Sequence, residues 1–193
     1  MSKTVFDISM SLDGFVTASN QTPEEPMGDE GLRLVAWAFD TDETNRHLLE
    51  RSGVALGAVI CGRRTYDHSL PWWGADGPSG LTRRPVFVVT HKAPAHNPPG
   101  GVYQFVTDGI EGALERAHTA AGDKDVCVMG GADLGRQYIA AGLVDEISIH
   151  LVPVLFGSGT RMFEDPYEKH VQMEVVDVLC TPSATHLRYR IVT

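Results

Sequence analysis

Three short segments place hydrogen-bond donors or glycines where an apolar run gives way to a helical pattern. The first, VICGRRTYD, runs from a buried-type strand through Gly62 into Arg63, Arg64 and Thr65. A helix that begins there presents unpaired N–H groups and the positive end of its dipole, which suit a phosphate. Two adjacent arginines add fork-shaped donors that can hold a phosphate bidentately. The segment predicts either a phosphate site or the solvated basic start of a helix.

The second and third segments are VFVVTHK and VMGGADLG. Thr90 and His91 end an expected strand, where hydroxyl and imidazole groups suit a nucleotide phosphate and its base, although strand ends are often polar without a ligand. Gly130 and Gly131 lack the Cβ atoms that would keep a diphosphate away from the backbone, although two glycines before a helix also form plain turns. All three segments follow expected strands, and parallel α/β sheets bind ligands beyond the carboxyl ends of their strands.

The first expected strand has a polar face. In VFDISMSLDG the side chains alternate, so Asp7, Ser9 and Ser11 share the face opposite the apolar residues. A polar row on a central strand is expected only where that face borders a cleft. Asp7, Ser11 and Asp13 are therefore candidates for hydrogen bonds to a polar heterocycle, with an ordinary Asp-Gly turn as the alternative for Asp13.

The elements that must position these residues alternate between strands and helices. Helical patterns cover 40–53, 108–122 and 132–142, and each ends at a glycine. Residues 19–31 and 69–85 are expected loops, and Trp72 and Trp73 in the latter are candidates either for stacking on a planar ring or for covering the edge of the core. Apolar or alternating runs predict strands at 3–10, 14–18, 54–62, 84–90, 101–106, 125–130, 144–156, 171–180 and 184–193.

This order predicts one three-layer α/β/α domain over residues 1–193. Strands that alternate with helices favour a central mixed sheet that is mainly parallel. The strand-only tail favours an antiparallel strand pair at the C-terminal end of the sheet.

Composition restricts the functional class. The chain has 193 residues, and 16 basic against 25 acidic side chains give a net charge of −9, which disfavours nucleic-acid and anionic-membrane partners. The N-terminus lacks the apolar core of a signal peptide and no stretch is long enough to span a bilayer, so a cytoplasmic protein is expected. Three scattered cysteines without a CxxC motif predict reduced, buried thiols, and the eight histidines lack metal-ligand spacing, so no metal is expected.

In order and spacing, SLDG, GRRT, VVT and VMGGADLGRQY resemble the dihydrofolate-reductase-like fold. The segments SMSLDGFVT and GLVDEISIHLVPVLFGSGTRMFE resemble more closely the C-terminal reductase domain of the bifunctional riboflavin-biosynthesis deaminase/reductase and its small stand-alone bacterial relatives. The resemblance runs from Val5 to about Phe163, most of the chain.

The resemblance implies NADPH as the hydride donor. It implies a cis peptide between the paired glycines of VMGGADLG and a carbonyl of Met129 directed toward the substrate. The residues that it assigns to the cofactor are Ser9 and Val16 beside the nicotinamide; Gly62, Arg63, Arg64 and Thr65 at the adenosine 2′-phosphate and diphosphate; Thr90 and His91 at the 2′-phosphate and adenine; and Gly130, Gly131, Ala132, Asp133 and Leu134 beneath the diphosphate and nicotinamide ribose.

The sequence departs from dihydrofolate reductases proper in one respect. Those enzymes carry an acidic residue on a helix soon after the first strand to polarise the pterin. Glu30, Asp40 and Glu43 all occur in the corresponding region, and none aligns uniquely. Reduction of dihydrofolate itself is therefore not implied.

The sequence thus predicts an NADPH-dependent reductase that transfers a hydride to a small polar heterocycle, similar to 5-amino-6-(5-phosphoribosylamino)uracil reductase or to a dihydrofolate-reductase-like activity. The alternative is a non-catalytic protein that binds a small molecule or drug on the same fold. By resemblance, the segment ISIHLVPVLFGSGTRMF is expected to make contacts in a homodimer.

Overall fold

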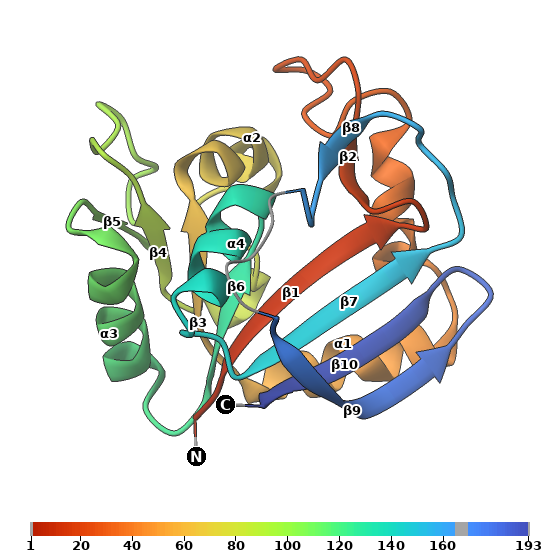
Figure 1. Cartoon of the computed structure of the whole chain (residues 1–193). Coiled ribbons are helices and arrows are strands. Elements are labelled where there is room, and N and C mark those ends of the chain that lie inside the picture. The colour runs from red at the N-terminus through yellow and green to blue at the C-terminus, as the bar shows by residue number, and fades with distance from the viewer. Residues whose placement is uncertain (1, 165–169, 193) are drawn as a thin grey trace.

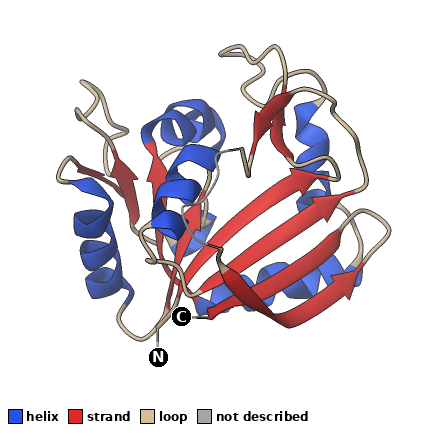
Figure 2. Ribbon diagram, viewed as in Figure 1, coloured by secondary structure: helices blue, strands red, loops and turns tan. Residues whose placement is uncertain are grey.

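The computed structural model describes residues 2–164 and 170–192. Its centre is an eight-stranded sheet with the strand order β5-β4-β3-β6-β1-β7-β10-β9 (Figures 1 and 2). From β5 to β7 neighbouring strands are parallel, whereas β10 is antiparallel to both β7 and β9. The strands of the sheet are β1 (Thr4–Ser11), β3 (Leu56–Gly62), β4 (Val86–Val89), β5 (Tyr103–Val106), β6 (Asp125–Met129), β7 (Glu146–Val152), β9 (Gln172–Cys180) and β10 (Thr185–Val192).

Helices cover both faces of the sheet. On one face, α3 (Gly109–Ala121) and α4 (Ala132–Ala140) pack with Phe6 and Ile60 into the largest core cluster. On the other face, α2 (Arg63–Trp73) packs through Tyr66 against β3, β4 and β5. Figure 1 shows α4 in front of the sheet and α1 (Glu43–Ala55) behind it. The expected three-layer architecture, with a mainly parallel sheet and an antiparallel C-terminal pair, is confirmed.

Short elements complete the fold. The 3-10 helices η1 (Gly31–Leu34) and η2 (Ala36–Phe39) precede α1, and η3 (Gly80–Thr82) follows α2. Strand β2 (Phe15–Ala18) pairs with β8 (Gly159–Arg161) in a separate two-stranded ribbon. The sequence gives no signal for β8, because three residues are too few to show a periodicity. No helix of the described residues is long and apolar enough to cross a membrane.

Two helices end later than their sequences predict. Helix α1 continues through Gly53 to Ala55, because the chain passes straight into β3 and needs no left-handed cap. Helix α2 continues through Pro71 to Trp73, although a loop is expected from Ser69. It ends at Gly74, whose φ is 53° and whose N–H donates to the carbonyl of Leu70.

Several exposed apolar residues gather on the edge strand of the sheet. Strand β7, which is expected to contribute to a homodimer, lies between β1 and β10 in the interior of the sheet. Edge strand β9 instead exposes Met173, Val175, Val176 and Val178. The homodimer stays a prediction. Cys180 at the end of β9 is also exposed, unlike the buried Cys61, so the expectation that all three thiols are buried is wrong.

Helix α4 approaches β1 so closely that Gly135 allows no side chain. A Cβ atom at this position would lie 2.4 Å from ring atoms of Phe6. We expect Gly135→Ala to lower the free energy of unfolding by about 1–3 kcal/mol, the usual range for overpacking a core. Chemical denaturation measures the loss. Gly53→Ala is the matched control, because a Cβ there meets nothing within 4 Å, and we expect it to leave stability unchanged or raise it by up to about 1 kcal/mol. Equal effects of the two substitutions would contradict this packing.

Candidate functional site

The three segments singled out in the sequence converge at one edge of the sheet. Strands β4, β3 and β6 are neighbours and parallel, so their carboxyl ends lie side by side. One pocket begins there and extends along the sheet toward β7 and β10. It is lined by every predicted site residue except Ser11 and Asp13, namely Asp7, Ser9, Val16, Gly62, Arg63, Arg64, Thr65, Thr90, His91, Met129, Gly130, Gly131, Ala132, Asp133 and Leu134.

Two helices direct their N-termini into this pocket. Gly62 precedes α2 and Gly131 precedes α4, and no side chain of the described residues caps either helix. The first N–H groups of both helices are therefore free to bind an acceptor, and both helix dipoles favour an anion.

The paired glycines leave space in front of these N–H groups. The peptide between Gly130 and Gly131 is cis, as the resemblance implies. Gly130 has a φ of 48°, which favours glycine, whereas Gly131 has an ordinary φ of −86°. A Cβ atom at Gly131 would have its nearest neighbour, Thr65 Oγ1, at 3.8 Å, so packing in the described residues does not require glycine there. A ligand that approaches the backbone does require it, and this arrangement fits a diphosphate.

The two arginines lie on either side of the start of α2. Arg63 forms an ion pair with Asp67 at 2.8 Å and donates from Nη1 to the carbonyl of Lys92. Arg64 reaches the side chain of Gln21 in the segment after β2, with Nη2 2.8 Å from Oε1. The Arg63–Asp67 ion pair and the Arg64–Gln21 hydrogen bond are both exposed, so a phosphate that binds here can replace them.

Ser11 and Asp13 have another place in the structure. Ser11 Oγ donates to Asp13 Oδ1 at 2.6 Å and accepts from the N–H of Phe15. The carboxylate of Asp13 also accepts from the N–H groups of Phe156 and Gly157. The Ser11 hydroxyl, followed by these backbone groups, lowers the pKa of Asp13 to about 2. These two side chains fasten the turn after β1 to the segment after β7 and do not face the pocket.

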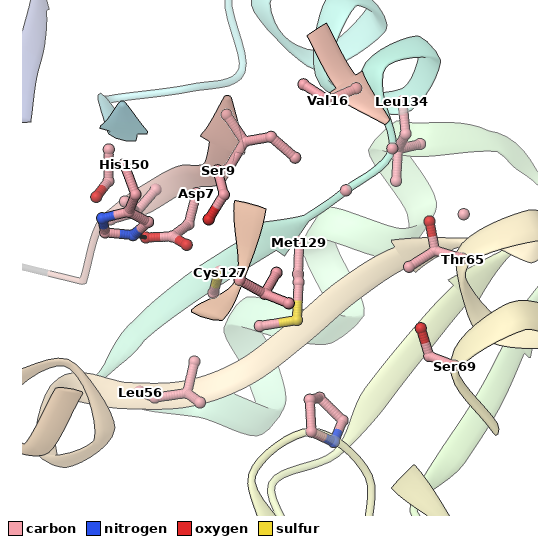
Figure 3. Close-up of a pocket in the computed structure, with 18 of the residues that line it drawn as sticks. Asp7, Ser9, Val16, Leu56, Thr65, Ser69, Cys127, Met129, Leu134 and His150 are labelled. Atoms are coloured by element: carbon pink, nitrogen blue, oxygen red, sulfur yellow. Dashed lines mark hydrogen bonds and ion pairs between the residues drawn. The ribbon is translucent and has the colours of Figure 1, made fainter. Parts of the chain in front are cut away.

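The polar face of β1 continues across the sheet. In the strand register Asp7 lies beside Ser148 of β7, which lies beside Arg188 of β10. Two residues further along β1, on the same face, Ser9 lies beside His150, which lies beside His186. Figure 3 shows Asp7, Ser9 and His150 together on one side of the pocket, with Met129 at its centre. Sequence reasoning identifies only the β1 members of these rows.

A chain of hydrogen bonds runs from the pocket into the protein. Asp7 Oδ2 lies 3.3 Å from His150 Nε2, and the Nδ1 atoms of His150 and His186 are 2.8 Å apart. His186 Nε2 lies 2.8 Å from Asn45 Oδ1. Asn45 Nδ2 donates to the carboxylate of Asp40, whose Oδ2 also accepts from Ser183.

Trp37 of η2 covers both imidazoles. Its ring centroid is 4.2 Å from that of His150 and 4.8 Å from that of His186, and its Nε1–H donates to Ser9 Oγ. Sequence reasoning does not single out Trp37, His150 or His186. The available signal is a histidine inside each of two apolar or alternating strands, ISIHLV and THLRYR.

The charges of this network are set by its surroundings. Burial alone raises the pKa of Asp7, but the charge and hydrogen bond of His150, with smaller contributions from Ser148 and Arg188, hold that pKa below its usual value. Burial, with the charge of His150, lowers the pKa of His186 to about 4, against the opposing effect of Asp7, Asp40 and Asp42. Near neutral pH, Asp7 is ionised and His186 is neutral.

The acids considered for a pterin-binding role do not line the pocket. Glu30 pairs with Arg33, and Glu43 lies 3.7 Å from Arg46, on the surface in each case. Asp40 is engaged with Asn45 and Ser183. Among the acids that line the pocket, Asp7 comes from the first strand rather than from a helix, and its strand forms the polar floor of the pocket.

Residues 2–187 match the RibD C-terminal domain family. The chain belongs to this family. Solved structures with a similar fold include a Shewanella sp. PV-4 protein named for riboflavin biosynthesis, which is 19% identical with a TM-score of 0.74 over 99% of both chains. The diaminohydroxyphosphoribosylaminopyrimidine deaminase/5-amino-6-(5-phosphoribosylamino)uracil reductase of Thermotoga maritima is 15% identical with a TM-score of 0.66, over 99% of this chain and 57% of that one.

A dihydrofolate reductase from Enterococcus faecalis complexed with NADP(H) is 13% identical with a TM-score of 0.60, over 98% of this chain and 96% of that one. These likenesses show that this RibD C-terminal domain has the dihydrofolate-reductase-like fold. The family assignment and the fold together indicate a protein of the reductase type.

Stability should depend on pH through His186. In the unfolded chain this imidazole takes up a proton near its ordinary pKa of 6.5, whereas in the folded protein the pKa is about 4. The unfolded state then binds more protons between these values, so the free energy of unfolding falls as the pH drops through this window, by up to about 3 kcal/mol. We expect His186→Gln to lose this part of the pH dependence in urea denaturation between pH 7 and 4.5.

The control for this measurement is His47→Gln, which removes an exposed imidazole from α1. It should keep the wild-type pH dependence. A wild-type slope in the His186→Gln protein would contradict the assignment of the slope to His186.

Proposed function

We propose that the protein is an NADPH-dependent reductase that transfers a hydride to the carbon of a C=N or C=O bond in a small polar heterocycle. The observation that carries this proposal is the pair of uncapped helix N-termini, α2 and α4, which share one pocket with the open backbone of Gly131. Such a site suits a diphosphate.

The residues around the helix termini fit the rest of this cofactor. Arg63 and Arg64, with Thr90 and His91 on the neighbouring strand end, surround the place where a 2′-phosphate would lie. Ser9, Val16 and Leu134 lie further along the pocket, where the nicotinamide would reach the polar floor formed by β1. When bound, NADPH supplies the hydride, while the chain binds and orients both reactants.

Similarity supports a pyrimidine or pteridine substrate. The Thermotoga maritima protein is named as a 5-amino-6-(5-phosphoribosylamino)uracil reductase, and the Enterococcus faecalis protein is a dihydrofolate reductase. The polar row of Asp7 and Ser9 offers hydrogen bonds to a heterocycle beside Met129. NADPH oxidation against a panel that contains both substrates tests the proposal directly.

Removal of the two arginines tests the cofactor. We expect the double variant Arg63→Ala/Arg64→Ala to raise the Kd for NADPH at least about tenfold, because hydrogen bonds to charged groups are worth about 1.5–3 kcal/mol each. The Kd for NADH, which lacks the 2′-phosphate, should change by less than about threefold. Titration calorimetry measures both constants. The double variant Arg33→Ala/Arg46→Ala, which removes two surface arginines outside the pocket, is the control. Failure of the wild-type protein to bind NADPH at millimolar concentration would overturn the proposal and favour a binding protein for another small molecule.

Gly131→Ala separates binding from folding. Its methyl group meets no described atom closer than 3.8 Å, so we expect a loss of at most about 1 kcal/mol in stability, the usual effect of alanine at this helix position. The same methyl group projects into the space for the diphosphate and should weaken NADPH binding at least about tenfold, or about 1.4 kcal/mol. If denaturation and calorimetry show equal losses, Gly131 serves only as a turn residue.

A further inference from the structure

Reduction of a C=N or C=O bond needs a proton as well as a hydride, and the polar floor of the pocket holds a pair of groups suited to supply it. Asp7 lies beside Met129 in the register of β1 and β6, and its side chain is 33% exposed to the pocket. His150, directly behind it, is 6% exposed. Both residues line the pocket, but the carboxylate is the more exposed of the two and therefore the better placed to touch a ligand.

The orientation of Asn45 fixes the proton of His186. Asp40 is ionised and only accepts hydrogen bonds, so the amide nitrogen of Asn45 must face Asp40 and its oxygen must face His186. His186 Nε2 then carries a proton and donates to Asn45 Oδ1. Because His186 is neutral, its Nδ1 has a lone pair and accepts.

This arrangement determines the protons of His150. The two Nδ1 atoms are 2.8 Å apart, which leaves room for one proton between them, and that proton belongs to His150. The remaining contact is between His150 Nε2 and Asp7 Oδ2. A carboxylate next to an unprotonated nitrogen would set two acceptors against each other, so this contact holds one further proton.

The charged and titratable groups around the pair come from each neighbouring element. Arg188 of β10 acts on Asp7 and forms an ion pair with the buried Glu146 of β7 at 2.6 Å. Cys127 of β6 faces Asp7, and burial raises the pKa of its thiol first, with the Asp7 charge adding to the effect. Asp40 and Asp42, before α1, act on His186. The Cys127 thiol remains neutral, so the proton of the Asp7–His150 contact is the one available to a ligand.

We propose that Asp7 and His150 act as one acid that protonates the substrate during its reduction, an inference that rests on the proposed function. As the carbon of the C=N or C=O bond gains a hydride from NADPH, the nitrogen or oxygen takes a proton from the carboxyl of Asp7. Asp7 draws this proton from His150 Nε2. The substrate gains two electrons and two hydrogens, NADPH is oxidised to NADP⁺, and a proton from solvent returns through the more exposed Asp7 to the neutral His150.

In this assignment Asp7 is the catalytic residue that touches the substrate. His186, Asn45 and Trp37 are positioning residues. The first two fix which nitrogen of His150 is free to transfer a proton, and Trp37 covers both rings against water.

The protonation pattern can be measured without substrate or cofactor. Nitrogen-15 NMR of the imidazoles in the wild-type protein near pH 7 should show His186 protonated at Nε2 alone and His150 protonated at both Nδ1 and Nε2. Protonation of His186 at Nδ1 would overturn the proposal. Assignment uses the His186→Gln variant, which removes one signal set.

The transfer itself is tested with Asp7→Asn, which keeps the shape of the side chain but cannot carry the proton. With whichever panel substrate the wild-type protein reduces, we expect the single-turnover rate to fall about 100-fold or more, the usual range for a general acid. The Kd for NADPH should stay within about twofold. The wild-type rate should fall as rising pH removes the proton shared by Asp7 and His150, and the variant should lose this dependence. Glu174→Gln, on the exposed edge strand β9, is the matched control and should keep both the wild-type rate and its pH profile.

These measurements separate the two proposals. Wild-type protein that neither binds NADPH nor oxidises it overturns the proposed function, whereas reduction by Asp7→Asn at the wild-type rate overturns only the acid assignment. Asn45→Ala tests the positioning role, because without the Asn45 side chain nothing fixes which ring nitrogen of His186 carries the proton. It should shift the pH profile of the rate without changing NADPH affinity, and an unshifted profile would contradict that role.

Discussion

The hydrogen-bonded register of β1, β7 and β10 is the constraint on which the polar part of the site depends. It places Ser9, His150 and His186 in one row and Asp7, Ser148 and Arg188 in the next. Side chains alternate along a strand, so a shift of one residue in any of these pairings would turn its histidine to the opposite face. The network therefore depends on strand pairing as a whole, because each side chain meets its partner only when all three strands keep this register.

The sheet divides the pocket between two kinds of chemistry. Strands β3, β4 and β6 end in segments that expose backbone N–H groups and basic side chains, and these suit an anionic ligand. Strands β1, β7 and β10 present titratable side chains from within their length. The two regions meet where β6 and β1 pair, with Met129 beside Asp7. That central position lets one extended ligand and one smaller ligand be held end to end.

The architecture was largely predictable from the sequence because its signals are local. Each signal depends only on residues that are neighbours in the sequence. Examples are the alternation of strands and helices, the glycines at 122 and 130–131, and the arginines after β3. Local patterns misplace the ends of α1 and α2, since Gly53 and Pro71 are compatible with helical backbone when the following chain does not demand a turn. Strand β8 forms only because β2 is beside it.

The hydrogen-bonded network could not be predicted in the same way. It joins residues from β1, η2, α1, β7 and β10, which are brought together only by the pairing of distant strands. The sequence shows Asp7 and Ser9 as polar residues in a strand but does not identify their partners. Ser11 follows the same alternation as Asp7 and Ser9 but holds the turn after β1, because it lies at the end of the strand and bonds to Asp13 and Phe15.

Helix α1 has an unusual relation to the sheet that it covers. Asn45 is the one buried residue in its thirteen, all of which are described. Polar contacts hold the helix near its two ends: Asp42 and Asn45 at the start, and Arg51 with Asp177, together with the Lys124 bond to the Val54 carbonyl, near the finish. An apolar stripe packed on the sheet would tie the helix position to the folding core, and this helix lacks one. Residues 48–55 of α1 line the pocket. Substitutions there can therefore change the shape of the pocket at little cost in stability, so evolution can change which molecules fit while β1 stays the same.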